Sequence, residues 1–238
     1  MRKTILILTI SLYLSAYALA TPVVPGDYEI SKDQNLSYIY SKEYRPILND
    51  LKTYQQHILE HYSKEYGFHL DATTYVGLAS HRNQIANAYS TQIPLNSQLF
   101  FGAGAGDIDY FCFSSWLKTL LLHETAHNFQ LNPKENLPSK LTHKLFGNTP
   151  FTILGFLPLF PLPNITESSF ILEGNAVMNE SRFGNGGRLY SGYALAEVVA
   201  LAHADLITPE LMYNDTYNFP YGEKAYLVGG FFQQFLAK

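Results

Sequence analysis

Apolar side chains recur at helical spacing across residues 41–66, and this pattern predicts a long amphipathic helix. The chain before it, at about 21–36, contains two prolines and a glycine and is predicted to be an extended lead-in. Two histidines four residues apart, His57 and His61, lie within the predicted helix. No glutamate follows His57 and no apolar run isolates the pair, so we expect both on a solvent-exposed face.

Three stretches rich in β-favouring residues follow, at 68–80, 85–91 and 98–101. Glycines at every second position of 102–106 end the third stretch. We expect these strands to form a small sheet. Its edge strand could pair with an extended peptide through main-chain hydrogen bonds, and an ordinary core sheet fits the same pattern.

An apolar run at 116–122 predicts another helix, which Ser114 or Ser115 can cap and which Asn132 and Pro133 end. Further helices are predicted at about 137–147, at 170–180 and near the end of the chain. Residues 151–163 are apolar but interrupted by prolines, so we expect them to cover the core or to form an apolar lip beside a cleft. Together the patterns predict an α+β fold in one domain at 21–238, with the sheet in about 21–132 and a mainly helical lobe in about 133–238.

The first twenty residues have the pattern of a signal peptide. Arg2 and Lys3 give a positive start, residues 5–14 are an apolar core, and residues 18–20 read Ala-Leu-Ala. We expect cleavage after Ala20 and a secreted or periplasmic protein. A retained membrane anchor is the alternative, which the short apolar core disfavours.

Composition narrows the function further. The chain has 238 residues, a formal net charge of −4 and no basic cluster, which argues against nucleic acid as a partner. Cys112 is the only cysteine, so an internal disulfide is excluded, and we expect it to be a small buried apolar residue.

The helix predicted after residue 115 carries His-Glu-Thr-Ala-His at 123–127. A helix advances about 3.6 residues per turn, so His123 and His127 lie on one face and can bind one metal ion. Glu124 lies beside that face, where it can act as general base towards a water molecule on the metal. Unpaired polar side chains are costly in a buried helix, which also favours a bound ion. The pattern predicts Zn²⁺ at His123 and His127, with Glu124 as the catalytic base.

A hydrolytic zinc site needs a third protein ligand, and Glu173 is the strongest candidate. Gly174 beside it costs about 1 kcal/mol relative to alanine in a helix, which indicates close approach of another backbone or of the site. A third histidine in the same segment is excluded, because Gln130 and Pro133 occupy the required glycine and histidine positions. His143 is a conceivable ligand, although it is more simply a surface residue.

Glu180 shares a helical stripe with Glu173, Ala176 and Val177. Small residues on this stripe would let the helix press against the helix of residues 123–127. Glu180 could orient a ligating histidine, pair with Arg182, or replace Glu173 as the ligand.

Four segments occur in order: Leu-Leu-Leu-His-Glu-Thr-Ala-His at 120–127, Leu-Glu-Gly-Asn-Ala-Val-Met-Asn-Glu at 172–180, Gly-Arg-Leu-Tyr-Ser at 187–191 and Tyr-Leu-Val-Gly-Gly-Phe-Phe at 226–232. Together they resemble the gluzincin zinc metallopeptidases, and more narrowly the bacterial peptidase MA-like domain family. The resemblance covers about residues 70–238. Asn175 departs from it, because the family commonly has an apolar residue there.

This resemblance implies a zincin-like fold, with a small mixed β-sheet, an active-site helix and a mainly helical C-terminal lobe. It implies Zn²⁺ on His123, His127 and Glu173, and hydrolysis of peptide bonds through a zinc-bound water with Glu124 as general base. A further donor to the oxyanion is expected. The candidates are Tyr226, Tyr193, Arg188 and His203.

Two other functions fit the same residues. One is a secreted, zinc-stabilised binding or scaffold protein without peptidase activity, which a fourth protein ligand on the metal would favour. The other is a metal-dependent hydrolase that acts on something other than peptides. An open position on the metal for water would favour an enzyme.

Overall fold

A computed structural model describes residues 28–70, 73–79, 87–91, 97–101, 115–132, 167–212 and 223–238, together with positions 137, 141, 144, 145 and 164. The described strands form one five-stranded mixed sheet in the order β1-β2-β3-β5-β4. Their bounds are β1 Tyr28–Asp33, β2 Leu36–Ser41, β3 Thr74–Leu78, β4 Asn87–Thr91 and β5 Ser97–Phe101. Strands β2, β3 and β5 are parallel, while β1 and β4 pair antiparallel at the two edges.

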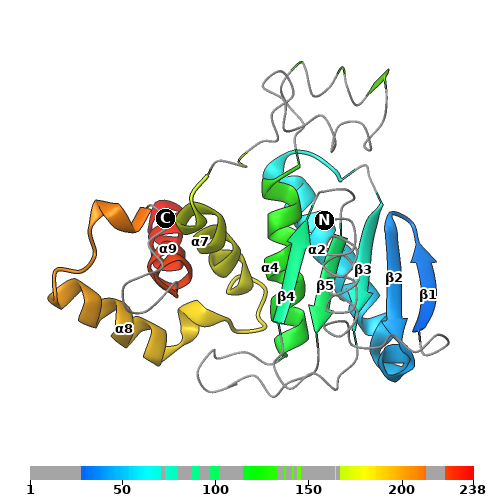
Figure 1. Cartoon of the computed structure of the whole chain (residues 1–238), viewed down its shortest axis with the longest axis horizontal. Coiled ribbons are helices and arrows are strands. Elements are labelled where there is room, and N and C mark those ends of the chain that lie inside the picture. Colours follow the sequence, from blue (N-terminus) through cyan, green and yellow to red (C-terminus); the bar gives the residue numbers. More distant parts are fainter. Residues whose placement is uncertain are drawn as a thin grey trace, which may run out of the picture.

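The helices account for most of the described residues outside the strands. They are η1 Lys42–Ile47, α2 Leu48–Tyr66, α4 Trp116–Gln130, α7 Ser169–Glu180, η2 Arg188–Tyr190, α8 Gly192–His203, η3 Pro209–Met212 and α9 Glu223–Leu236. Pro46 lacks an amide hydrogen and lies in η1, so the regular helix α2 begins only after it. The hydroxyl of Ser115 caps α4 by accepting from the Lys118 amide. In Figure 1, α4 lies between the sheet and the pair of helices α7 and α9.

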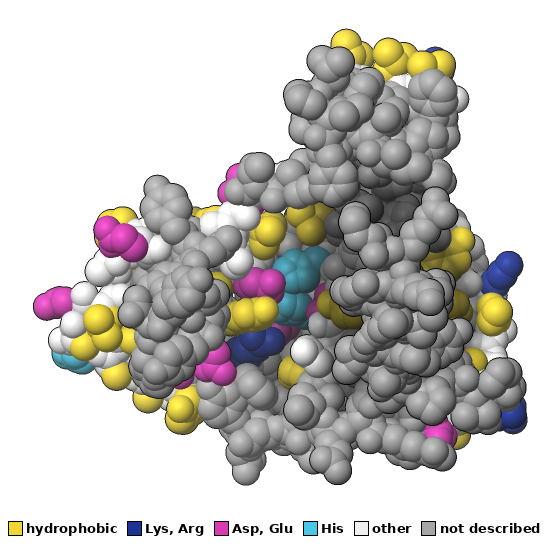
Figure 2. Space-filling model, viewed as in Figure 1, with side chains coloured by type: hydrophobic (Ala, Val, Ile, Leu, Met, Phe, Trp, Pro, Cys, Tyr) yellow, Lys and Arg dark blue, Asp and Glu magenta, His cyan; other side chains and the backbone are white. Residues whose placement is uncertain are grey.

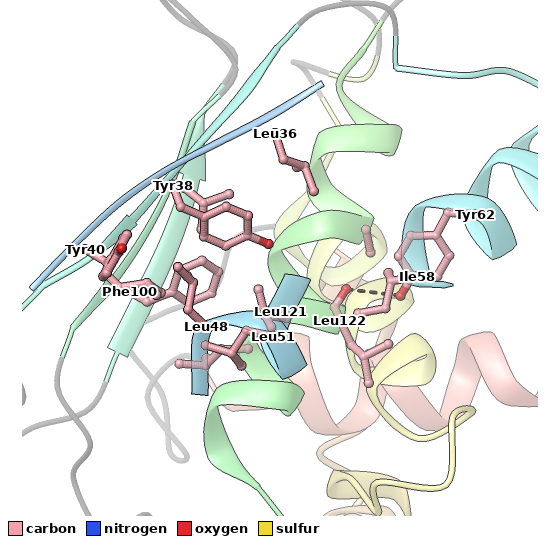
Figure 3. Close-up of a cluster of buried hydrophobic side chains, with 14 of the residues drawn as sticks. Leu36, Tyr38, Tyr40, Leu48, Leu51, Ile58, Tyr62, Phe100, Leu121 and Leu122 are labelled. Atoms are coloured by element: carbon pink, nitrogen blue, oxygen red, sulfur yellow. Dashed lines mark hydrogen bonds between the residues drawn. The ribbon is translucent and has the colours of Figure 1, made fainter. Parts of the chain in front are cut away.

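One large apolar cluster joins the sheet to α2 and α4 (Figure 3). Tyr38 and Phe100 from the sheet and Ile58 from α2 are almost completely buried in it. Tyr62 of α2 is also fully buried, and its hydroxyl donates to the Leu122 carbonyl of α4 at 3.0 Å. This cluster holds α4 against the sheet.

A chain of buried polar side chains runs through the same layer. The Tyr38 hydroxyl donates to the side-chain oxygen Oε1 of Gln55, and Gln55 Nε2 donates to Gln98 Oε1 at 2.8 Å. The Gln98 amide nitrogen donates to Thr125 Oγ1 at 3.1 Å and to Asn128 Oδ1 at 2.6 Å. Because unmade hydrogen bonds are costly in the interior, these contacts fix how α4 is rotated against the sheet.

Helices α7 and α9 touch backbone to backbone. A side chain at Gly174 would place its Cβ 2.5 Å from the Gly229 carbonyl carbon, and one at Gly229 would meet the Phe170 carbonyl oxygen at 2.5 Å. The close approach predicted from Gly174 is therefore confirmed, and the partner backbone is that of α9. On another face of α7, the fully buried Ala176 joins the apolar cluster that contains α4.

The α+β class is confirmed, as are the strands within 68–80, 85–91 and 98–101 and the helices at 116–131 and 170–180. The helix predicted at 41–66 is confirmed for 48–66, whereas Ser41 ends β2 and residues 42–47 form the separate 3-10 helix η1. The lead-in predicted at 21–36 is wrong where β1 and the start of β2 lie. The buried side chains of Leu36, Tyr38 and Tyr40 alternate with a period of two, which is the strand pattern.

Several predicted features lie outside the described residues. They are the signal peptide at 1–20, Cys112, Ser114, most of the helix at 137–147 and the apolar run at 151–163. Among the described helices, none is both long and apolar enough to cross a bilayer.

Candidate metal centre

Helix α4 carries three chemically active side chains into the interior. His123, Glu124 and His127 are all buried, and the two imidazoles lie with their ring centroids 4.7 Å apart. The apolar cluster and the bonds from Gln98 hold the other side of α4, so the histidines face α7. The rotation of α4 thus determines what the histidines meet.

Helix α7 brings Glu173 to the two histidines. Its Oε2 lies 3.0 Å from His123 Nε2 and 3.2 Å from His127 Nε2, and the two Nε2 atoms are 3.1 Å apart. The structure therefore gathers the three residues that the sequence analysis selected as ligands into a group that can hold one metal ion.

The far nitrogen of His123 is bound by a buried acid. Glu180 Oε1 lies 2.7 Å from His123 Nδ1, and the same oxygen accepts from the Arg188 guanidinium at 3.0 Å. Arg182 pairs with Glu65 instead. Of the three roles considered for Glu180, its contacts match the first, in which it orients a ligating histidine.

The far nitrogen of His127 is bound by an amide. Gln130 Oε1 lies 2.8 Å from His127 Nδ1, and Gln130 is itself buried. Both histidines therefore have an oxygen acceptor at Nδ1, which leaves each Nε2 to point at the space beside Glu173. This arrangement is typical of metal-binding histidines.

Negative charge dominates the group. Burial alone would lower the pKa of His123, but hydrogen bonds to Glu173 and Glu180, with the nearby Glu124 charge, raise it to about 10. Burial would raise the pKa of Glu173, but its contacts with the His123 and His127 imidazoles hold that pKa well below the usual range. Surroundings that favour a proton on His123 also favour a metal cation at the same place.

After the charge of the group, the surroundings of Glu124 are a second indication of whether a metal ion fits here. Its side chain is buried, and its Oε2 has no hydrogen-bond partner among the described residues. An isolated buried carboxylate oxygen is costly, whereas one that faces a metal with a bound water has a partner. The donors of the group and this oxygen are compatible with a metal site.

Two of the four candidate oxyanion donors lie at the group. The Tyr226 ring of α9 stacks on His123 at 6.0 Å between centroids, and the Arg188 guanidinium carbon lies 4.9 Å from the Tyr226 centroid. Tyr193 and His203 lie instead on α8, where both are exposed to solvent. In Figure 2, histidine, acidic and basic side chains gather in a hollow in the middle of the displayed face.

Other histidines of the sequence analysis have simpler roles. His57 and His61 are exposed on α2, as predicted, and His61 lies 3.5 Å from Glu65. His143 lies outside the described residues. Sequence reasoning missed the contacts of Gln130 and Asn175. Gln130 of α4 bonds to Asn175 of α7, and Tyr66 of α2 reaches the same residue, so these contacts depend on how the helices pack.

Comparison with known proteins gives no match: no protein-family model, no curated protein and no solved structure matches this chain.

Proposed function

We propose that this protein is a zinc-dependent metallopeptidase of the gluzincin type, with a zincin-like fold and His123, His127 and Glu173 as the ligands of Zn²⁺. The observation that carries the proposal is the convergence of three donors beside the unpaired oxygen of Glu124. Two imidazoles and one carboxylate are a donor set that suits catalytic zinc. Tetrahedral zinc with bonds of about 2.0–2.1 Å separates its ligand atoms by about 3.3 Å, close to the separations found here.

Zinc on these three ligands would keep a fourth position for water, which an enzyme requires and a closed structural site does not have. Zinc bound there would lower the pKa of a water molecule and polarise a substrate carbonyl. Glu124 takes the proton of the attacking water and returns it to the leaving amine.

Tyr226 is the best-supported donor to the developing oxyanion. Burial raises the pKa of Tyr226, and the nearby negative charges of Glu173 and Glu124 add to this effect, so the phenol keeps its proton and can donate. Arg188 is engaged with Glu180 and with the Tyr226 ring, which suits it to holding the tyrosine in place.

Strand β4 offers a place where a peptide substrate could bind. It is an edge of the sheet that the described strands form, antiparallel to β5, and it contacts α4. An extended peptide can add to such an edge through main-chain hydrogen bonds, which bind it without reading its side chains. We further propose that the mature chain begins after Ala20 and works in the periplasm or outside the cell.

The test is digestion of casein and a peptide library by the zinc-loaded chain from Thr21 onward, with Glu124→Gln as the matched variant. We expect cleavage by the wild type and a rate about 10²–10⁴ times lower for the variant, because the general base is lost while the ligands remain. Zinc content measured on both proteins checks that point. Full activity in Glu124→Gln would refute the role of Glu124, and no cleavage by fully loaded wild type would favour the binding or scaffold alternative.

A further inference from the structure

The amide of Gln130 can adopt only one orientation in its surroundings. Its Nε2 donates to the Leu172 carbonyl at 3.1 Å and to Asn175 Oδ1 at 2.9 Å. A flipped amide would set its oxygen against the Leu172 carbonyl oxygen, which can only accept. Gln130 Oε1 therefore faces His127 Nδ1, as its distance of 2.8 Å indicates.

The orientation of Asn175 is fixed independently, starting from a guanidinium group. Arg182 can only donate, and its NH1 lies 3.2 Å from Asn179 Oδ1, so the Asn179 amide nitrogen faces the other way. That nitrogen donates to Asn175 Oδ1 at 3.1 Å, and the Tyr66 hydroxyl reaches the same oxygen at 2.8 Å. Asn175 Oδ1 is thus an acceptor, and Gln130 must present its nitrogen to it.

The two hydrogen-bond arguments determine which ring nitrogen of His127 carries the hydrogen. Since Gln130 Oε1 can only accept, His127 Nδ1 must carry the hydrogen. In the neutral ring, the other nitrogen, Nε2, then has the lone pair, and it points toward Glu173 Oε2 at 3.2 Å. The Leu172 carbonyl belongs to the residue directly before Glu173, so Gln130 also ties the backbone of α7 to α4 beside the site.

We infer that Gln130 and Asn175 are positioning residues of the metal centre, which hold His127 as its Nδ1-protonated tautomer and set the distance between its Nε2 and Glu173. This inference rests on the metal site of the proposed function, and it does not require that the protein cleave peptides. It also gives a role to Asn175, a polar residue where the resemblance leads one to expect an apolar one.

The test compares Gln130→Leu, Asn175→Leu and Asn175→Asp with the wild type. Zinc dissociation constants come from competition with a chromogenic chelator. The tautomer comes from ¹⁵N–¹H correlation spectra of the histidine rings in the zinc-free proteins, and unfolding in urea shows that each variant is folded. Gln56→Leu in α2 is the matched control, because Gln56 bonds to Asp33 and both lie far along the sequence from Gln130 and Asn175.

We expect Gln130→Leu to bind zinc about 10–100 times more weakly, the usual effect of losing an outer partner of a ligand. Asn175→Leu should weaken binding by a smaller factor, up to about 10-fold, because it acts through Gln130. Asn175→Asp keeps the acceptor oxygen that Gln130, Tyr66 and Asn179 share, and should bind zinc within about threefold of the wild type, as should Gln56→Leu.

The spectra should show His127 protonated at Nδ1 in the wild type and in Asn175→Asp, and a mixture of tautomers in Gln130→Leu. Wild-type zinc affinity in a folded Gln130→Leu, or an Nε2-protonated His127 in the wild type, would overturn the inference. The expected affinities and tautomers in a protein that cleaves no peptide would support it while contradicting the proposed peptidase.

Discussion

The same three side-chain types occur in the same order at two places in the molecule, with different results. His61, Glu65 and Arg182 form a chain at the surface, where the His61 side chain is 46% exposed and lies 3.5 Å from Glu65. His123, Glu180 and Arg188 form a chain inside, where the His123 side chain is 5% exposed and lies 2.7 Å from Glu180.

Each of these histidines also has a second histidine four residues away, His57 on α2 and His127 on α4. At the surface, water can replace every partner, and among the residues that the structure describes no carboxylate of another helix bridges His57 and His61. In the interior, α7 supplies Glu173 and α9 covers His123 with Tyr226. Histidine spacing alone therefore does not gather a set of metal donors; here a carboxylate from another helix completes the set.

The largest difference between the surface group and the buried group should appear when the arginine of each, Arg182 or Arg188, is replaced. We expect Arg188→Met to lower the free energy of unfolding by about 3 kcal/mol, because it leaves the fully buried Glu180 with only His123 as its charged partner. Arg182→Met at the surface should cost about 0–1 kcal/mol. Urea denaturation followed by circular dichroism measures both, and equal small losses would contradict the distinction.

The next largest difference between the two histidine pairs should be the effect of metal removal on the melting temperature. Zinc at about 100 times its dissociation constant stabilises the folded chain by about 2.7 kcal/mol, so adding a chelator should lower the melting temperature of the wild type. His61→Ala should respond like the wild type and differ from it by less than about 0.5 kcal/mol. His127→Ala should show no response, and a chelator effect that survives in it would place the metal elsewhere.

The smallest of the three effects concerns the packing of α9 on α7, which has no counterpart at the surface group of His61, Glu65 and Arg182. Gly229→Ala should destabilise the protein by about 2 kcal/mol, because the added methyl would lie 2.5 Å from the Phe170 carbonyl oxygen and force α9 away from α7. Gly192→Ala is the matched control, since a Cβ at Gly192 meets nothing within 4 Å, and it should be neutral or slightly stabilising. Unfolding curves of the two variants measure the difference, and equal stability would argue against close packing of α7 on α9.

Local patterns were enough to predict most of the described helices and the burial of two histidines on one face of α4. The cap at Ser115 and the histidine spacing need only a few neighbouring residues, so they are visible in the sequence. The pairing of β2 with β3 depends on residues far apart in the chain, whereas β1 and β2 are neighbours joined only by Gln34 and Asn35. Alternating apolar residues at 36–40 carried a signal for β2, which the prolines and glycine of the preceding segment obscured.

The partner of Glu180 shows why the rest of the site could not be predicted. Arg182 is closer in sequence, but it lies beyond the end of α7 and pairs with Glu65 of α2 instead. The chain turns back after α7, where Gly184, Gly186 and Gly187 have positive φ, and it brings Arg188 against Glu180. A Cβ at Gly187 would lie 2.5 Å from Ser181 Oγ, so the turn is tight, and only the folded backbone reveals which arginine it delivers.

The contact between Gly174 and Gly229 has a consequence for biosynthesis. The two glycines come from helices separated by some fifty residues, which a ribosome adds in a few seconds at about 5–20 residues per second. Until α9 has been made, α7 lacks the backbone on which it rests, and His123 lacks its aromatic cover. The nascent polypeptide thus displays both histidines well before α9 covers His123, so any metal ion that this centre holds would be enclosed only in the last stage of folding.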